Sequence, residues 1–312
     1  MLKYVLKRLL ITIPVLLCVT FIVFSIMQLT PGSPAASILG PTAPQEQIDK
    51  LNHELGYDRP FFTRFFDFIV DVLHGDFGES YRTREPVAKE IGVRFPTTLK
   101  LAIFSMLISA TIGITLGVIS AVKQYSPLDT TMTVLALLFA AVPGFWLGLM
   151  LIWIFAVTLQ CLPTSGMASW KSMILPLATL SVGGIAALLR ITRSAMLETI
   201  RQDYIRTARA KGASEKSVII RHALTNALLP VITVLGMNFS GMLGGAVIAE
   251  TVFSMPGVGQ YIVQAIRQKN DPVVLSCTLL LAMLNCLIML LVDIIYAFVD
   301  PRIKARFATK KG

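Results

Sequence analysis

Six apolar runs, each long enough to cross a lipid bilayer, limit what this chain of 312 residues can fold into. A helix needs about 20 apolar residues to cross the hydrocarbon core, and its backbone polar groups must pair within the segment. Only 15% of the residues are charged, whereas soluble domains average about 25%. The sequence therefore predicts an all-α integral membrane protein with six transmembrane helices. The six runs are residues 9–29, 101–122, 132–159, 172–189, 227–249 and 273–292.

The first run follows a basic start, as the apolar core of a signal peptide does. A signal peptide has an apolar core of about 7–15 residues, whereas residues 9–29 contain 21 without a charge. We therefore expect a retained helix. The chain then divides into an N-terminal transmembrane helix (1–30), an external, periplasmic-side segment (31–98), a transmembrane core (99–300) and a basic cytoplasmic tail (301–312).

The distribution of charge predicts the orientation, because six spans place both termini on one side of the membrane. With both termini inside, the cytoplasmic segments hold 17 Lys and Arg residues against 11 outside. The acidic residues divide 5 against 12, with Asp293 left within a span. Basic residues collect on the cytoplasmic side of membrane proteins. We therefore expect a multi-pass membrane protein with both termini in the cytoplasm. Its net charge of +10 then reflects topology and contact with lipid, and no nucleic-acid partner is expected.

Small residues mark helix surfaces that can approach one another closely. They recur every fourth position in the second span, and glycines are similarly spaced in the fifth. A proline in the third span removes a backbone donor and is expected to kink the helix. Helix packing is the first interpretation, and part of this surface is expected to border a pathway. The positions are Ser105, Ser109, Gly113, Gly117, Pro143, Gly241 and Gly245.

The sequence carries no motif for chemistry of its own. It has no G-x-x-x-x-G-K-[ST] loop to cradle the phosphates of ATP, and no H-E-x-x-H or G-x-S-x-G motif. Its four cysteines form no C-x-x-C pair. Asp293 is the one ionisable residue well inside an apolar run, where a structural pairing and a role in transport are both open. We expect no catalytic residue, metal or cofactor in this chain, so any transport by it would need energy from elsewhere.

Residues 198–230 form the longest basic interruption in the second half of the chain. Arg201–Lys211 has helical periodicity, and Gly212 is placed to end that helix. Ser214 is placed to cap a second helix, whose apolar positions follow helical spacing from Ile220 to Leu228. A solvated loop that obeys the positive-inside rule is one interpretation. Two phased helices around a glycine favour another, a rigid protrusion that docks on a second protein.

This stretch carries a family resemblance. The segment YIRTARAKG (204–212) is similar to the coupling motif of bacterial ABC importer permeases, and more narrowly to that of the dipeptide, oligopeptide, glutathione and nickel importers. The general motif begins Glu-Ala-Ala where this chain has Arg206, Thr207 and Ala208, a departure typical of the peptide and nickel branch. Further matches cover essentially the whole chain. They are PGSP (31–34), GDFG (75–78), PGFW (143–146), ETVFSMPGVG (250–259) and DPRI (300–303).

The resemblance implies a type I importer of a bacterial inner membrane, in which this chain and a second, homologous permease subunit form the pathway. Two ATP-binding subunits would hold ATP and magnesium and switch the pathway between inward- and outward-open states. An external solute-binding protein would deliver the substrate, and residues 99–300 would be the permease core. The residues expected to couple to an ATPase subunit are Tyr204, Arg206, Thr207, Ala208, Arg209, Lys211, Gly212, Ala213 and Ser214.

Two amphipathic segments are expected outside the spans. Residues 258–266 follow a Pro-Gly turn and have helical spacing, so they form either a plain turn with an interfacial helix or an external gate that docks the binding protein. Residues 61–73 carry an apolar face that is expected to lie on the membrane surface, against the spans or on a partner. The candidate gate comprises Glu250, Phe253, Pro256 and Gly257.

Peptides are the leading substrate class, with nickel or a nickel chelate as the alternative. A carrier or channel that works alone is the competing class of transporter, and a membrane enzyme is a third. The coupling motif disfavours the carrier, and the missing catalytic constellation disfavours the enzyme.

Overall fold

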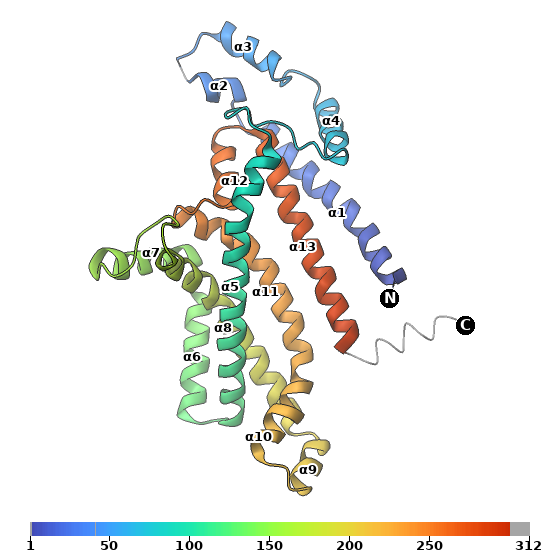
Figure 1. Ribbon diagram of the computed structural model, residues 1–312, viewed down its shortest axis with the longest axis vertical. Coiled ribbons are helices and arrows are strands. Elements are labelled where there is room, and N and C mark those ends of the chain that lie inside the picture. Colours follow the sequence, from blue (N-terminus) through green and yellow to red (C-terminus); the bar gives the residue numbers. More distant parts are fainter. Residues whose placement is uncertain (1, 41, 300–312) are drawn as a thin grey trace. The chain divides into compact units, whose positions relative to one another are not determined.

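The computed structural model describes residues 2–40 and 42–299. These residues form helices joined by loops (Figure 1). Within the described residues, extended pairing is limited to one isolated bridge between Glu79 and Pro86. The chain divides into two compact units. Of the described residues, unit 1 contains 100–253 and 287–299, and unit 2 contains 2–40, 42–99 and 254–286. The predicted tail and the DPRI motif lie outside the described residues.

The predicted all-α membrane fold is confirmed. Among the described residues, five helices are long and apolar enough to cross a membrane, and a sixth span arises if one bent pair is counted as a single crossing. Each of the five contains one of the predicted apolar runs. The five are Val5–Leu29, Val87–Val122, Trp170–Ile200, Glu215–Val252 and Asp271–Ile295.

The third predicted span is broken where a kink was expected. Helix α6 (Pro127–Ala141) and the helical stretch that begins at Gly144 meet at an angle of 101°. Val142 is extended, with φ −78° and ψ 124°, because a residue before proline avoids the α conformation. Pro143 is extended as well, with ψ 131°. Two consecutive extended residues turn the chain, so that α7 (Gly144–Leu151) runs across the direction of α6 (Figure 1).

Unit 1 is built around α8 (Ile174–Ile200), which packs against α6, α7 and α11 (Thr225–Val252). A π-helical turn, η1, continues α7, and a short 3-10 turn, η2, leads into α8. The chain leaves α8 through a short hairpin of helical pieces before it enters α11. The remaining elements of unit 1 are η1 (Ile152–Thr158), η2 (Trp170–Met173), α9 (Asp203–Ala210), α10 (Glu215–Ser217), η3 (Val218–Leu224) and the adjoining ends of α5 (Val87–Val122) and α13 (Asp271–Val299).

Helices α5 and α8 lie unusually close, because small residues line their contact. A Cβ atom added at Gly117 would lie 2.6 Å from Cβ of Thr192, and one at Gly113 would lie 2.8 Å from Cβ of Leu188. Hydroxyl groups add polar links across the same contact. The Ser109 hydroxyl donates to the carbonyl of Ser181 at 2.9 Å. The structure thus places this stripe of α5 directly against α8.

Unit 2 combines the first helix of the chain with elements from near its C-terminus. Its apolar core joins the start of α5 to α12 and the start of α13, with Met27 of α1 packed alongside. Lys269 is buried, and its ammonium group donates to the carbonyls of Met27 and Thr30, which pairs free carbonyl groups at the end of α1. The helices of unit 2 are α1 (Leu2–Leu29), α2 (Pro34–Leu39), α3 (Gln45–Glu54), α4 (Phe61–Leu73), α12 (Val258–Arg267) and the adjoining parts of α5 and α13.

Replacing Gly117 by alanine is expected to destabilise unit 1. Alanine favours a helix by about 1 kcal/mol over glycine, but the new methyl group would also meet the Leu189 carbonyl oxygen at 2.8 Å. Overpacking of this kind costs about 1–3 kcal/mol, so the melting temperature of the purified protein should fall. Gly92→Ala on the same helix is the control, because nothing lies within 4 Å of its added Cβ. A Gly117→Ala protein that melts at or above the temperature of the unaltered chain would contradict the close contact.

Candidate functional site

The basic segment folds as a helical hairpin at one end of unit 1 (Figure 1). Helix α8 ends at Ile200, and Gln202 is extended with ψ 150°. Helix α9 therefore begins at Asp203, two residues later than the sequence predicted. After the turn, α10, η3 and α11 follow one another without a gap from Glu215 to Val252. One end of this long helical stretch thus carries the hairpin, and the rest of it crosses the membrane.

The bend of the hairpin is a Schellman motif centred on Gly212. The amide of Gly212 donates to the carbonyl of Arg209 at 2.9 Å, and the amide of Ala213 donates to that of Ala208 at 3.2 Å. Gly212 has φ +80°, a left-handed conformation that glycine adopts without strain. The prediction that Gly212 ends the first helix is confirmed. Ser214 occupies the predicted N-cap position, but its side chain makes no capping hydrogen bond.

The hairpin is attached to unit 1 through apolar contacts. Ile205 of α9 is fully buried and belongs to a cluster contributed by α5, α8, η3 and α11. Ala208 and Ala213 are half-buried and pack against the same cluster. The other buried members of this attachment cluster are Ala121, Ala195, Met196, Val218, Ala223 and Ala227.

The opposite face of the hairpin is exposed and basic. Nε and Nη2 of Arg209 donate to the two carboxylate oxygens of Glu215, at 2.7 and 3.2 Å, and these hydrogen bonds raise the pKa of Arg209. Arg206 is 78% exposed and lies 3.9 Å from Asp203, a surface pair that stabilises little. Partial burial raises the pKa of Tyr204. The predicted coupling residues on the exposed side are Tyr204, Arg206, Thr207, Arg209, Lys211, Gly212 and Ser214.

A buried ion pair joins α6 to α8, and reasoning from the sequence did not predict it. Asp129, in the first turn of α6, is buried and accepts two hydrogen bonds from the guanidinium group of Arg193, at 2.7 and 2.8 Å. The amide of Tyr125 also donates to this carboxylate at 2.9 Å, and the Ser120 hydroxyl contacts it. A bidentate pair of this kind fixes orientation as well as distance. The signal in the sequence was Asp129 itself, a single acid at the start of an uncharged run. Its partner Arg193 lies 64 residues further along the chain, so spacing did not reveal the pair.

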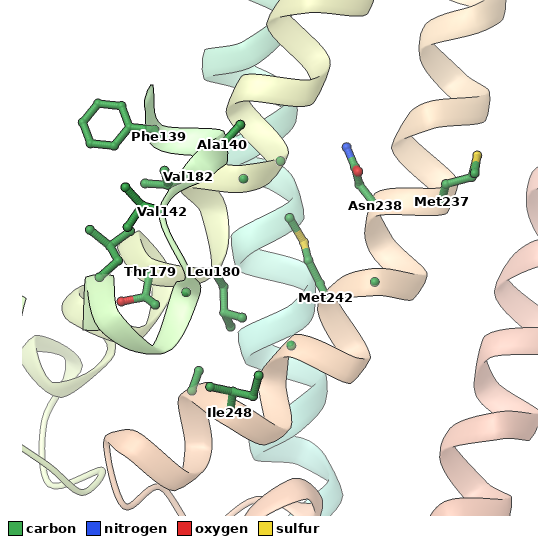
Figure 2. Close-up of a pocket in the computed structure, with 17 residues that line it drawn as sticks. Phe139, Ala140, Val142, Thr179, Leu180, Val182, Met237, Asn238, Met242 and Ile248 are labelled. Atoms are coloured by element: carbon green, nitrogen blue, oxygen red, sulfur yellow. The ribbon is translucent and has the colours of Figure 1, made fainter. Parts of the chain in front are cut away.

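A cavity of about 370 Å³ lies within unit 1, between the α6–α7 break, α8 and α11 (Figure 2). Its wall is mostly apolar, and glycine backbone is bare on it at Gly183 and Gly241, where an added Cβ would meet nothing within 4 Å. Asn238 points towards it in Figure 2, and its buried Nδ2 has no hydrogen-bond partner within the described residues. The lining residues are Phe139, Ala140, Val142, Gly144, Leu147, Thr179, Leu180, Val182, Gly183, Gly184, Met237, Asn238, Gly241, Met242, Gly245, Ile248 and Ala249.

The positions predicted to pack helices or border a pathway separate into two groups. Gly241 and Gly245 line the cavity, and Pro143 stands between two lining residues in the α6–α7 break. The stripe from Ser105 to Gly117 instead lies between α5 and α8.

The candidate gate residues occupy different environments. Glu250 and Phe253 are buried in unit 1, where the carbonyl of Phe253 accepts a hydrogen bond from the amide of Gly166 at 3.0 Å. Pro256 is exposed, and Gly257 precedes α12 in unit 2. The predicted amphipathic helix is present as α12. Within the described residues, no three His, Cys, Asp or Glu side chains gather as metal ligands.

Comparison with known proteins identifies the class. The family described as "Binding-protein-dependent transport system inner membrane component" matches residues 113–305, and its N-terminal counterpart matches residues 1–102. A chain of a structure titled "Inward facing conformations of the MetNI methionine ABC transporter" aligns with a TM-score of 0.58 and 22% identity, over 69% of this chain and 99% of that one. This last likeness shows a shared fold. The chain is therefore a multi-pass inner-membrane component of a binding-protein-dependent ABC importer. Such a component takes part in transport and is not an enzyme.

Two curated relatives place it more narrowly. It is 41% identical to the "Dipeptide transport system permease protein DppB" of Alkalihalophilus pseudofirmus, over 97% of this chain and 100% of that protein. It is 40% identical to the "Glutathione transport system permease protein GsiC" of Escherichia coli K12, over 97% and 99%. The chain belongs to the peptide ABC importer permease family, and the resemblance inferred from its motifs is confirmed.

Ile205→Ala is expected to loosen the hairpin from unit 1. Truncating a buried isoleucine costs about 2–5 kcal/mol, and much of this loss should fall on α9, which has no other fully buried residue. Hydrogen exchange at the amides of α9 should therefore accelerate more than exchange in α8. Thr207→Ala is the matched control, because Thr207 lies on the exposed face of the same helix. Equal protection of α9 in both variants would show that Ile205 does not attach it.

Proposed function

We propose that this chain translocates peptides, of the dipeptide, oligopeptide or glutathione-like class, as one permease subunit of an importer driven by ATP hydrolysis in partner subunits. One observation carries the proposal: an exposed basic hairpin is attached, through Ile205, to α8 and α11, which both line the cavity. The relatives named for dipeptide and glutathione transport support this substrate class over nickel.

The geometry supports a mechanical role for the hairpin. Its exposed face would dock in a groove of an ATPase subunit, and its buried face transmits any displacement to α8 and α11. Both helices contribute walls of the cavity, so their rotation would change its shape and access. Nucleotide binding in the partner shifts such an equilibrium only if the two states make different contacts with it. The hairpin is the segment where those contacts would differ, and the movement would be a rigid-body switch.

The full assembly we propose has a second homologous permease, two ATPase subunits that hold ATP and magnesium, and an external solute-binding protein. The basic hairpin and both termini would face the cytoplasm, in line with the positive-inside distribution of Lys and Arg. Exposed Pro256 would then lie on the external side, where the Pro-Gly turn before α12 would serve as a gate or docking surface. A plain turn with an interfacial helix is the alternative there.

The cavity has a size and chemistry suited to a peptide passing through. Its volume of about 370 Å³ lies within the range of about 300–1,000 Å³ that small-molecule sites occupy. Bare glycine backbone and the amide of Asn238 present polar groups beside apolar side chains. Peptides share such alternating amide and apolar groups. Selection among peptides would be made mainly by the binding protein.

The direct test is ATPase stimulation in the complete reconstituted importer. We expect its binding protein to stimulate hydrolysis when loaded with peptide, and more strongly than when loaded with nickel. Arg206→Glu should lower the stimulated rate by about tenfold, or ~1.4 kcal/mol, because it reverses a charge on the docking face. Insertion of the chain into the membrane should be unchanged.

Lys123→Glu is the matched control, since Lys123 is exposed on the turn between α5 and α6 and lies outside the hairpin. Equal losses in both variants would exclude a specific role for Arg206. Transport that continues after ATP is removed would support the alternative, a carrier that works alone. Stimulation by nickel and not by peptide would overturn the substrate assignment.

A further inference from the structure

Helix α4 of unit 2 has three distinct faces. Thr63, Asp67 and Asp71 form a polar face. A second, apolar face is covered by the chain itself. The third face is apolar and bare, and at about 100° per residue its four members fall within an arc of about 80°. They are Phe62, Phe66, Val70 and Leu73, with exposed fractions of 63%, 60%, 51% and 80%.

The covered face of α4 packs on α1. Phe61 and Phe65 meet Phe21 and Phe24 edge to face, with ring centroids 4.9–5.9 Å apart. Phe24 and Phe65 are 3% and 8% exposed and share a small core with Leu275. Contacts of this geometry hold aromatic pairs firmly. The position of α4 along α1 is therefore fixed by these four rings.

The contact lies beside the part of α1 that crosses the membrane. The candidate span runs from Val5 to Leu29 with a mean hydropathy of 2.8. Phe21 lies eight residues before Leu29, about 12 Å deeper at a rise of 1.5 Å per residue. Helix α4 thus touches α1 at the level of the hydrocarbon, although α4 itself is too short to span a bilayer.

The surface that α4 covers continues beyond it as bare apolar surface. Leu10, Ile13 and Leu17 follow helical spacing towards Phe21 and Phe24, and they are 65%, 54% and 41% exposed. This stripe belongs to the membrane-crossing part of α1, whose exposed apolar side chains suit lipid. Helix α4 is thus packed on a stripe of α1 whose remaining members are exposed and apolar.

We propose that the bare face of α4 is embedded among the acyl chains of the leaflet in which α1 ends at Leu29. Helix α4 is then an in-plane membrane anchor, with its polar face towards the headgroups and water. Amphipathic helices lie in this way about 5–10 Å into the boundary between headgroups and acyl chains. The four side chains of the bare face carry no charge, which suits lipid.

The anchor has a consequence within unit 2. The side chain of Arg64 on α4 is largely buried. It pairs with Asp271 at the start of α13 at 3.3 Å and stacks on the Tyr57 ring at 4.2 Å. Lipid that holds α4 at the membrane boundary therefore also fixes the level at which α13 begins.

Fluorescence quenching in vesicles tests the anchor. The parent chain has its four cysteines (Cys18, Cys161, Cys277 and Cys286) replaced and is kept in the complete importer, with ATPase activity retained as the check on folding. Phe66→Cys and the matched polar-face control Thr63→Cys are each labelled with a small environment-sensitive fluorophore in phosphatidylcholine vesicles. Quenching is measured with a phosphatidylcholine that carries a nitroxide at the headgroup end of its acyl chain, and with aqueous iodide.

We expect the label at position 66 to be quenched several-fold more by the nitroxide lipid than the label at position 63, and to be shielded from iodide. A label at position 73, on the same bare face, should behave as the label at 66 does. Equal nitroxide quenching at positions 63 and 66 would overturn the proposal. Shielding at position 66 from both quenchers would also overturn it, because a protein surface would then cover the face.

Discussion

The burial of Ile205 is the contact on which the proposed coupling between the hairpin and the cavity depends. Helix α9 has only eight residues, too few to be stable without tertiary packing. Its single fully buried side chain joins a cluster built from four other helical segments. The attachment leaves the basic face free for a partner and makes the hairpin move with α8 and α11. Without it, the exposed residues would form a flexible loop that transmits no displacement.

Close packing around α8 connects the attached hairpin to α5 and α6 as well. The small-residue stripe brings α5 into contact with α8, and the buried pair of Asp129 with Arg193 ties the start of α6 to the same helix. The break at Val142 and Pro143 turns the chain by 101°, so that residues before and after the break both line the cavity. Under the proposed coupling, a displacement at the hairpin would reach the cavity through these packed helices.

The sequence predicts the elements that depend on local chemistry. Apolar runs predict the spans, because lipid leaves few other ways to pair a backbone. Gly212 predicts the bend, because a left-handed turn after a helix favours glycine. The sequence predicted only a kink at Pro143. Proline can either kink a helix or divide it in two, and which of these occurs depends on packing against α8 and α11. The Asp129–Arg193 pair and the cavity depend on contacts between distant segments, which one sequence does not encode in its spacing.

The most direct measurement of the coupling is the reactivity of a cysteine placed in the cavity. Gly241→Cys introduces a thiol where the structure has open space, in a chain whose native cysteines have been replaced. Its rate of modification by a water-soluble thiol reagent is compared in the assembled importer without nucleotide and with ATP trapped. We expect the two rates to differ several-fold, because ATP bound by the partner subunits that dock on the hairpin would reshape the cavity. Equal rates, in an importer that still hydrolyses ATP, would contradict mechanical coupling between the hairpin and the cavity.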